Sequence, residues 1–307
     1  MRSRLDCVAV ALLLLGPWPS TGALTAQTRP GAADPVRSDP AVTDSLNPPG
    51  TADVALESRG ARMNGILYTA SGPGPHPTVV LLHGFAGNER NLDLAQAIRR
   101  AGINVLVFSY RGAWGSGGTF SFANALEDVA AAARFVRSDA AAKEYRTDPR
   151  RVALLGHGMG GWLALMGAAI DSRLVCAGAL EIWNAGARGR LLRTDRRQDS
   201  VATDHGDWLT GAGGPIRAES GQVLSAELKD HANTWDVDRH ANQLRARRLL
   251  LISSTANPDH PSLTTALRRA GARQVTGLTW NTDHSFSAYR IKLASTVIDW
   301  LHRSCGM

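Results

Sequence analysis

The feature that most constrains the fold is a glycine-rich turn set between a strand-like run and a helix-like run. Residues 151–155 read Arg-Val-Ala-Leu-Leu, and residues 156–161 read Gly-His-Gly-Met-Gly-Gly. A short apolar run bounded by glycines is typical of a buried strand in a parallel sheet. Glycines allow a sharp turn and a close approach of the chain that follows. We therefore expect a buried strand, a tight turn and then a helix.

Similar apolar runs alternate with helical patterns along most of the chain. The pattern predicts strands at residues 54–57, 62–70, 78–83, 103–110, 152–155, 174–182, 249–253 and 274–280, the first two as an antiparallel pair. It predicts helices at residues 91–101, 122–142, 161–170, 262–269 and 288–301. Strands separated by helices imply a mostly parallel sheet with helices on both faces. Residues 184–247 break the pattern, and a stretch of this length is more typical of an inserted cap or lid than of a plain loop.

The composition is that of a globular protein and gives few signs of a special partner. Of 307 residues, 44% are hydrophobic and 20% charged, which is enough to bury a full core. The formal net charge of +7 includes an arginine cluster at residues 188–197, which we interpret as a solvated loop. No nucleic-acid motif interleaves aromatics with these arginines. We therefore expect no nucleic-acid partner. The histidines and cysteines show no metal-binding spacing, and we expect no metal or cofactor.

The first 26 residues have the order of a secretory signal peptide. Two arginines precede an apolar run at residues 8–15, which is followed by Gly-Pro and by small residues. This run is too short to span a bilayer, so we expect no stable membrane span. Cleavage is expected after Ala23 or Ala26, which predicts a secreted or periplasmic protein. Residues 27–50, rich in Pro, Asp, Ala, Gly and Ser, predict a flexible linker before a folded domain at residues 51–307.

Two cysteines, Cys176 and Cys305, remain once the signal peptide is removed. An oxidising compartment would allow them to pair. Because sequence gives no geometry, two buried free thiols are the favoured expectation.

The glycine-rich turn resembles the nucleophile elbow of α/β-hydrolases, particularly of the serine-aminopeptidase-like and dienelactone-hydrolase-like group. That family keeps a serine at the centre of a G-x-S-x-G turn, where the hydroxyl attacks the substrate. Gly158 stands at this position here. The resemblance therefore implies an α/β-hydrolase fold, ester or peptide hydrolase ancestry, and a degenerate catalytic triad.

Other family motifs follow in the same order along the chain. His83-Gly84 matches the oxyanion loop after the third strand, and residues 110–118 resemble the family's Y-R-G-x-G-x-S loop. The resemblance implies that the N–H groups of Phe85 and Met159 form the oxyanion hole. His284 precedes the last helix, where the family keeps its general base.

The residue that would orient His284 is left open between three candidates. Asn257 stands where the family keeps an aspartate, and an amide would stabilise an imidazolium less than a carboxylate does. Asp259 follows two residues later. Glu181 ends the sixth strand, from which some members supply the acid.

A competing motif is G-x-G-x-x-G at Gly156, Gly158 and Gly161, with Glu181 twenty residues further on. These are the elements of a dinucleotide-binding turn. Two facts count against it: exported proteins rarely meet soluble NAD, and the fingerprint normally sits on the first βα unit.

Two main function classes follow from these residues. One is an exported protein without serine-nucleophile catalysis that binds a small acyl or peptide-like ligand. The other is an enzyme in which His284 acts directly over the oxyanion hole, a site that can give roughly 10³–10⁴-fold acceleration without a nucleophile. The sequence does not determine the oligomeric state.

Overall fold

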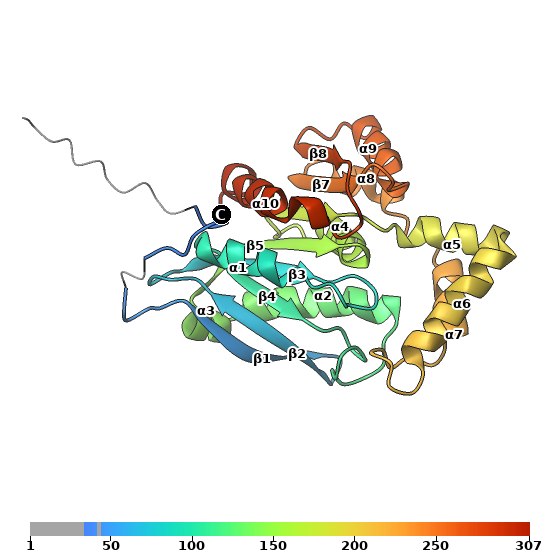
Figure 1. Cartoon of the computed structure of the whole chain (residues 1–307), viewed down its shortest axis with the longest axis horizontal. Helices are drawn as coiled ribbons and strands as arrows, with labels where there is room; N and C mark the ends of the chain where they lie inside the picture. The colour runs from blue at the N-terminus through green and yellow to red at the C-terminus, as the bar shows by residue number, and fades with distance from the viewer. Residues whose placement is uncertain (1–33, 42–43) are drawn as a thin grey trace, which may run out of the picture. The chain divides into compact units, whose positions relative to one another are not determined.

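The computed structural model describes residues 34–41 and 44–307 (Figure 1). The expected signal peptide and residues 27–33 and 42–43 of the expected linker lie outside these ranges. Over the described residues, no helix is long and apolar enough to cross a membrane. Part of the expected linker contacts the domain, since Arg100 donates a hydrogen bond of 2.6 Å to the carbonyl of Pro35.

A single eight-stranded sheet forms the centre of the domain (Figure 1). Its spatial order is β1 (Gly50–Ser58), β2 (Ala61–Thr69), β4 (Asn104–Phe108), β3 (His76–Leu82), β5 (Thr147–His157), β6 (Cys176–Leu180), β7 (Leu249–Ser254) and β8 (Val275–Trp280). β1–β2 and β2–β4 pair antiparallel, and all later neighbours are parallel. The expected antiparallel pair and mostly parallel sheet are confirmed.

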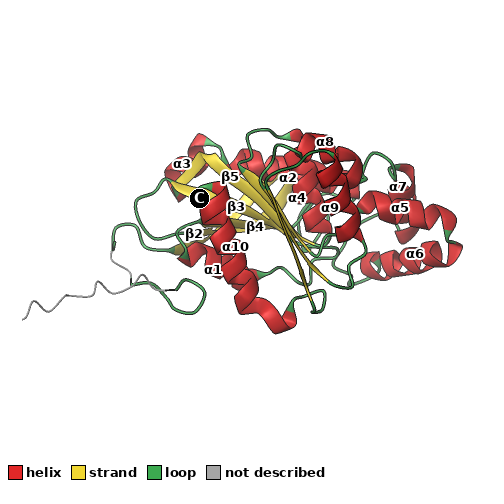
Figure 2. Ribbon diagram, turned by 90° about the horizontal axis from the view of Figure 1, so that it is seen from above, coloured by secondary structure: helices red, strands yellow, loops and turns green. Residues whose placement is uncertain are grey.

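Helices cover both faces of this sheet, as expected (Figure 2). One face packs against α1 (Leu92–Arg100) and α10 (Arg290–Cys305), and the other against α2 (Phe122–Val136), α4 (Met159–Ile170) and α9 (Asp259–Arg269). Side chains alternate between the two cores along a strand. In β5, for example, Leu154 belongs to the core on the α4 side and Leu155 to the core on the α10 side. Burial on both faces explains why these strands read as continuous apolar runs.

The helix expected at residues 122–142 is divided in two. α2 ends at Val136, and α3 (Asp139–Tyr145) begins after Ser138. The Ser138 hydroxyl accepts a hydrogen bond from the N–H of Ala141 at 3.1 Å, which makes it the N-cap of a new helix. A local side-chain contact thus interrupts a sequence whose alanines favour a continuous helix.

Between β6 and β7 the chain forms a helical segment. Its elements are α5 (Ala185–Thr194), α6 (Arg196–Thr210), α7 (Gly221–Asp230), the 3₁₀ turn η1 (Val237–His240) and α8 (Ala241–Leu244). Figure 1 shows α5, α6 and α7 grouped at one end of the molecule. Glycines take several of the buried positions that apolar side chains would otherwise fill, which weakens the helical pattern in the sequence. A Cβ at Gly189 would overlap the Leu228 carbonyl, and one at Gly206 would meet Gly221 at 2.5 Å.

Cys176 and Cys305 form a disulfide, so the expectation of two free thiols is wrong. Cys176 begins β6, and Cys305 ends α10, which runs back across the same face of the sheet. This path brings the two Cα atoms to 5.7 Å, within the usual range for a disulfide.

Candidate functional site

The glycine-rich turn connects β5 to α4 at the centre of the sheet. A Cβ on Gly156 would overlap the Gly160 carbonyl, and a Cβ on Gly160 would overlap the Leu82 carbonyl. These two glycines are therefore needed for α4 to pack closely on β5 and on β3. The residue between them, Gly158, has φ 57° and ψ −118°, a conformation that is strained for residues with a side chain.

Space, in contrast, does not require glycine at position 158. A Cβ built on Gly158 would have as its nearest neighbours Cε1 and Nε2 of His284, both at 3.7 Å. A side chain at this position would thus face the imidazole expected to act as the base. The structure brings Gly158 and His284 together, although they are far apart in the sequence.

The loop that carries His284 lies between β8 and α10 and is held by a second histidine. Nε2 of His157 lies 2.8 Å from the carbonyl oxygen of His284, and the two rings lie 4.6 Å apart. A carbonyl can only accept, so the His157 proton is on Nε2 and Nδ1 accepts from the Asn91 amide at 3.3 Å. His157 lies in the glycine-rich turn, and its hydrogen bond to the His284 carbonyl helps to position the exposed His284 ring. Sequence reasoning did not single out this residue.

Burial keeps two histidines of this region neutral. The pKa of His157 falls to about 4, first because of burial and then because of repulsion from His284. Burial also lowers the pKa of His83, at the end of β3, to about 4. Both groups would take up protons near pH 6.5 once unfolded, so below that pH the unfolded chain binds protons that the native state excludes.

We predict that the free energy of unfolding decreases as the pH falls from about 6.5 toward about 4. Each histidine contributes a slope of about 1.4 kcal/mol per pH unit, because the unfolded chain binds the proton that the native state excludes. A His157→Gln variant keeps an N–H donor for the His284 carbonyl and should show a slope smaller by about one proton. Urea unfolding at several pH values measures this. Equal slopes in both proteins would contradict the burial of a neutral His157.

The three acid candidates lie near one another but have other hydrogen-bond partners. The Asn257 amide donates to Glu181 at 3.1 Å and to the Ile182 carbonyl at 2.9 Å, and its oxygen accepts from the N–H groups of Asp259 and His260. Asn257 thereby caps the start of α9.

Glu181 accepts from the N–H of Ser254 at 2.6 Å and from its hydroxyl at 2.8 Å. Both oxygens of Glu181 thus accept hydrogen bonds from the chain itself. A dinucleotide-binding fold needs this carboxylate for the ribose hydroxyl, so the arrangement counts against that alternative. Asp259 accepts from the N–H of Asn184 at 2.8 Å. Burial raises the pKa of Asp259, and repulsion from Asp238 and Asp236 adds to this rise. The role of an acid toward His284 stays a prediction for all three residues.

The expected oxyanion residues line the cavity beside Gly158. Phe85 follows the end of β3, and Met159 is the first residue of α4, where a backbone N–H has no partner within its own helix. Both line the same cavity as Gly84, Gly158 and His284. Their assignment as an oxyanion hole stays a prediction.

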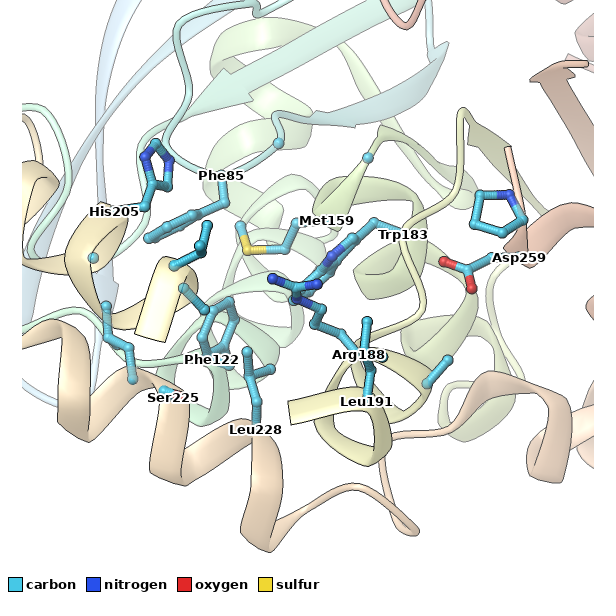
Figure 3. A pocket seen from close by; sticks show the side chains of 18 of the residues that line it. Phe85, Phe122, Met159, Trp183, Arg188, Leu191, His205, Ser225, Leu228 and Asp259 are labelled. Atoms are coloured by element: carbon cyan, nitrogen blue, oxygen red, sulfur yellow. The ribbon is translucent and has the colours of Figure 1, made fainter. Parts of the chain in front are cut away.

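A cavity of about 610 Å³ opens beside Gly158 (Figure 3). Besides the five residues just named, its wall combines aromatic and aliphatic side chains with a few polar groups, namely Phe122, Trp183, Ala187, Arg188, Leu191, Val201, Ala202, His205, Gly206, Leu224, Ser225, Leu228, Pro258 and Asp259. Most of these come from residues 184–247. Sequence reasoning missed their role because the segment shows no motif, and only the folded chain brings it over the turn.

The described part of the chain offers no metal centre. Within residues 34–41 and 44–307, no three His, Cys, Asp or Glu side chains are grouped so that they could hold a metal ion. What the site offers chemically is an imidazole, backbone N–H groups and an apolar cavity.

Comparisons with known sequences place these features in a family. A sequence model described as the alpha/beta hydrolase family matches residues 79–290. The uncharacterized protein Rv2307c of Mycobacterium tuberculosis is 30% identical over 119 residues, which cover 38% of this chain and 41% of that protein. YfhR of Salmonella typhimurium, also uncharacterized, is 34% identical over 116 residues, covering 38% of this chain and 37% of that protein. The chain thus matches less than half the length of these curated relatives.

Solved structures support the same fold. The 2,6-dihydroxy-pseudo-oxynicotine hydrolase is similar with a TM-score of 0.63 and 17% identity, covering 84% of this chain and 68% of that one. Est1E from Butyrivibrio proteoclasticus, determined with ferulic acid bound, has a TM-score of 0.62 and 15% identity, covering 83% of this chain and all of that one. At such identities the likeness concerns the fold alone. Because the family match extends over more than half of the chain, from β3 to the start of α10, this protein belongs to the alpha/beta hydrolase family.

Proposed function

We propose that this protein binds a small acyl or peptide-like ligand in the cavity beside Gly158 and does not use a serine nucleophile there. One observation carries the proposal: a cavity of about 610 Å³ adjoins the turn at which the family keeps its serine, and the residue at that turn has no hydroxyl. Glycine also relieves the backbone strain of this conformation, which costs a residue with a side chain about 1–3 kcal/mol. We include in the proposal that residues 184–247 serve as the cap of this cavity.

A second candidate function is an enzyme in which His284 activates a water molecule directly. It is favoured by the open space between Gly158 and the exposed His284 ring, which a serine side chain would otherwise occupy. Backbone N–H groups of Phe85 and Met159 would then stabilise the developing oxyanion.

An experiment with 4-phenylbutanamide separates the two functions, because this compound is an uncharged acyl ligand whose phenyl group suits the aromatic wall. Calorimetry measures binding, and chromatography measures release of 4-phenylbutanoate. For the proposed binder we expect binding without release in the unmodified protein, in His284→Ala and in His302→Ala, a control on the exposed side of α10. Release that only His284→Ala abolishes would establish the enzyme instead. Absence of both binding and release would contradict both functions.

We also propose that the protein is exported. The short apolar run at residues 8–15 supports this, and the disulfide between Cys176 and Cys305 suits an oxidising compartment. The expected result is that protein isolated from its native host begins near residue 24 or 27, as measured by its intact mass. Recovery of a chain that still carries residues 1–23 would count against processing.

A further inference from the structure

One cation lines the otherwise mostly apolar cavity. Arg188 lies in α5, and its side chain is half-buried. Figure 3 shows its guanidinium pointing into the cavity toward Met159 and Trp183. The arginine cluster at residues 188–197, which the sequence presents as a solvated loop, therefore includes a member that faces inward.

The charge of Arg188 is not matched by a carboxylate. Its guanidinium donates a hydrogen bond to Gln198 at 3.0 Å, and Gln198 is a neutral partner. Over the described residues, no Asp or Glu oxygen comes within ion-pair distance of Arg188. Arg190, two residues later on the same helix, does pair with Asp236. Arg188 therefore keeps guanidinium N–H groups from which an anion outside the chain can accept.

The apolar surroundings of Arg188 favour the binding of an anion. Phe122, Trp183, Leu191 and Leu228 line the same cavity, and a cation beside apolar side chains loses hydration that an ion pair can replace. The acidic group in the wall is Asp259, whose carboxylate already accepts from the N–H of Asn184. In the view of Figure 3, Asp259 lies on the far side of Trp183 from the guanidinium.

Building on the ligand-binding function proposed above, we infer that the ligand carries a free carboxylate and that Arg188 binds it. A guanidinium can donate two parallel hydrogen bonds to a carboxylate, which fixes its orientation as well as its charge. The rest of the ligand would then lie along Phe122 and Trp183. The natural ligand would accordingly be an apolar or aromatic acid, not a neutral ester or amide.

Comparison of 4-phenylbutanoate with 4-phenylbutanamide tests this inference, because the two differ in charge and hardly in shape. At pH 7.5, calorimetry should show the carboxylate binding about tenfold to a hundredfold more tightly than the amide, the usual range for hydrogen bonds to charged groups. Arg188→Met should remove this preference, so that the two compounds bind the variant about equally. Arg193→Met, an exposed arginine on the same helix, is the matched control and should keep the preference.

Other outcomes would refute the acidic ligand, the role of Arg188 or the binding function. Equal affinity of both compounds for the unmodified protein would refute the acidic ligand and leave the binding function intact. A preference that survives Arg188→Met would refute the role of Arg188. If neither compound binds the unmodified protein, this inference and the proposed function are refuted together. Retained amide binding shows that the Arg188→Met variant is folded.

Discussion

A Gly158→Ser variant is expected to become labelled by a fluorophosphonate probe, whereas the unmodified protein stays unlabelled. A Cβ at position 158 has His284 Nε2 at 3.7 Å, so a serine hydroxyl would lie within reach of a general base. Phe85 and Met159 line the same cavity, and their N–H groups are the predicted donors to the phosphonyl oxygen. Gel fluorescence and peptide mapping measure the labelling.

Two further variants serve as controls for this result. Gly158→Ala carries the same backbone strain, so it should lose about 1–3 kcal/mol of stability, like the serine variant, and gain no labelling. Gly158→Ser combined with His284→Ala should lose most of the labelling, because the hydroxyl then has no base. Absence of labelling in a folded Gly158→Ser variant would show that this turn does not present the side chain to His284.

Labelling of the unmodified protein would overturn the proposal that it lacks a nucleophile. Two serines are relevant to this outcome. Ser116 is buried, donates to the Ser109 carbonyl at 2.9 Å and accepts from the N–H of Asn64 at 3.0 Å, so its hydroxyl is a structural link. Ser225 lines the cavity but donates to Asp199, which also binds Lys229. Label mapped to Ser225 would identify a nucleophile within residues 184–247.

Restoring an aspartate at position 257 is not expected to improve the serine variant. The sequence suggests this change, since the family keeps an aspartate there. In the structure the Asn257 amide donates to Glu181, so a carboxylate at that position would place two like charges together. We expect Asn257→Asp to lower stability and to leave the labelling of Gly158→Ser unchanged.

Loss of the disulfide is expected to reduce the free energy of unfolding by about 2–5 kcal/mol. The bond between Cys176 and Cys305 closes a loop with a sequence separation of 129 residues and ties the last helix to β6. A long closed loop removes much of the freedom of the unfolded chain, which is the state that a disulfide mainly affects. The measurement is urea unfolding of Cys176→Ala with Cys305→Ala, compared with the unmodified protein.

A reductant separates the effect of the lost disulfide from any change of packing that the two alanines cause. Dithiothreitol should destabilise the unmodified protein during urea unfolding and have no effect on the double alanine variant. Both proteins responding equally, or free thiols at both positions in the non-reduced protein, would contradict the bond.

The sequence by itself determined the sheet and the turn at its centre. Buried parallel strands must be apolar on both faces, so β3, β4 and β7 are visible as continuous runs. The glycines at positions 156 and 160 are visible for a similar reason, since close packing of strand and helix admits no side chain there. The order of these motifs also indicated His284 as the group facing Gly158.

Only the tertiary structure decided what surrounds that turn. The cavity and Arg188 come from helices in which glycines take several of the buried positions, which weakens the hydrophobic period in the sequence. The partners of Asn257, the role of His157 and the disulfide depend on contacts between segments that are 76, 127 and 129 residues apart in the sequence. Local sequence patterns report burial and backbone conformation, whereas such contacts depend on where the whole chain brings each side chain.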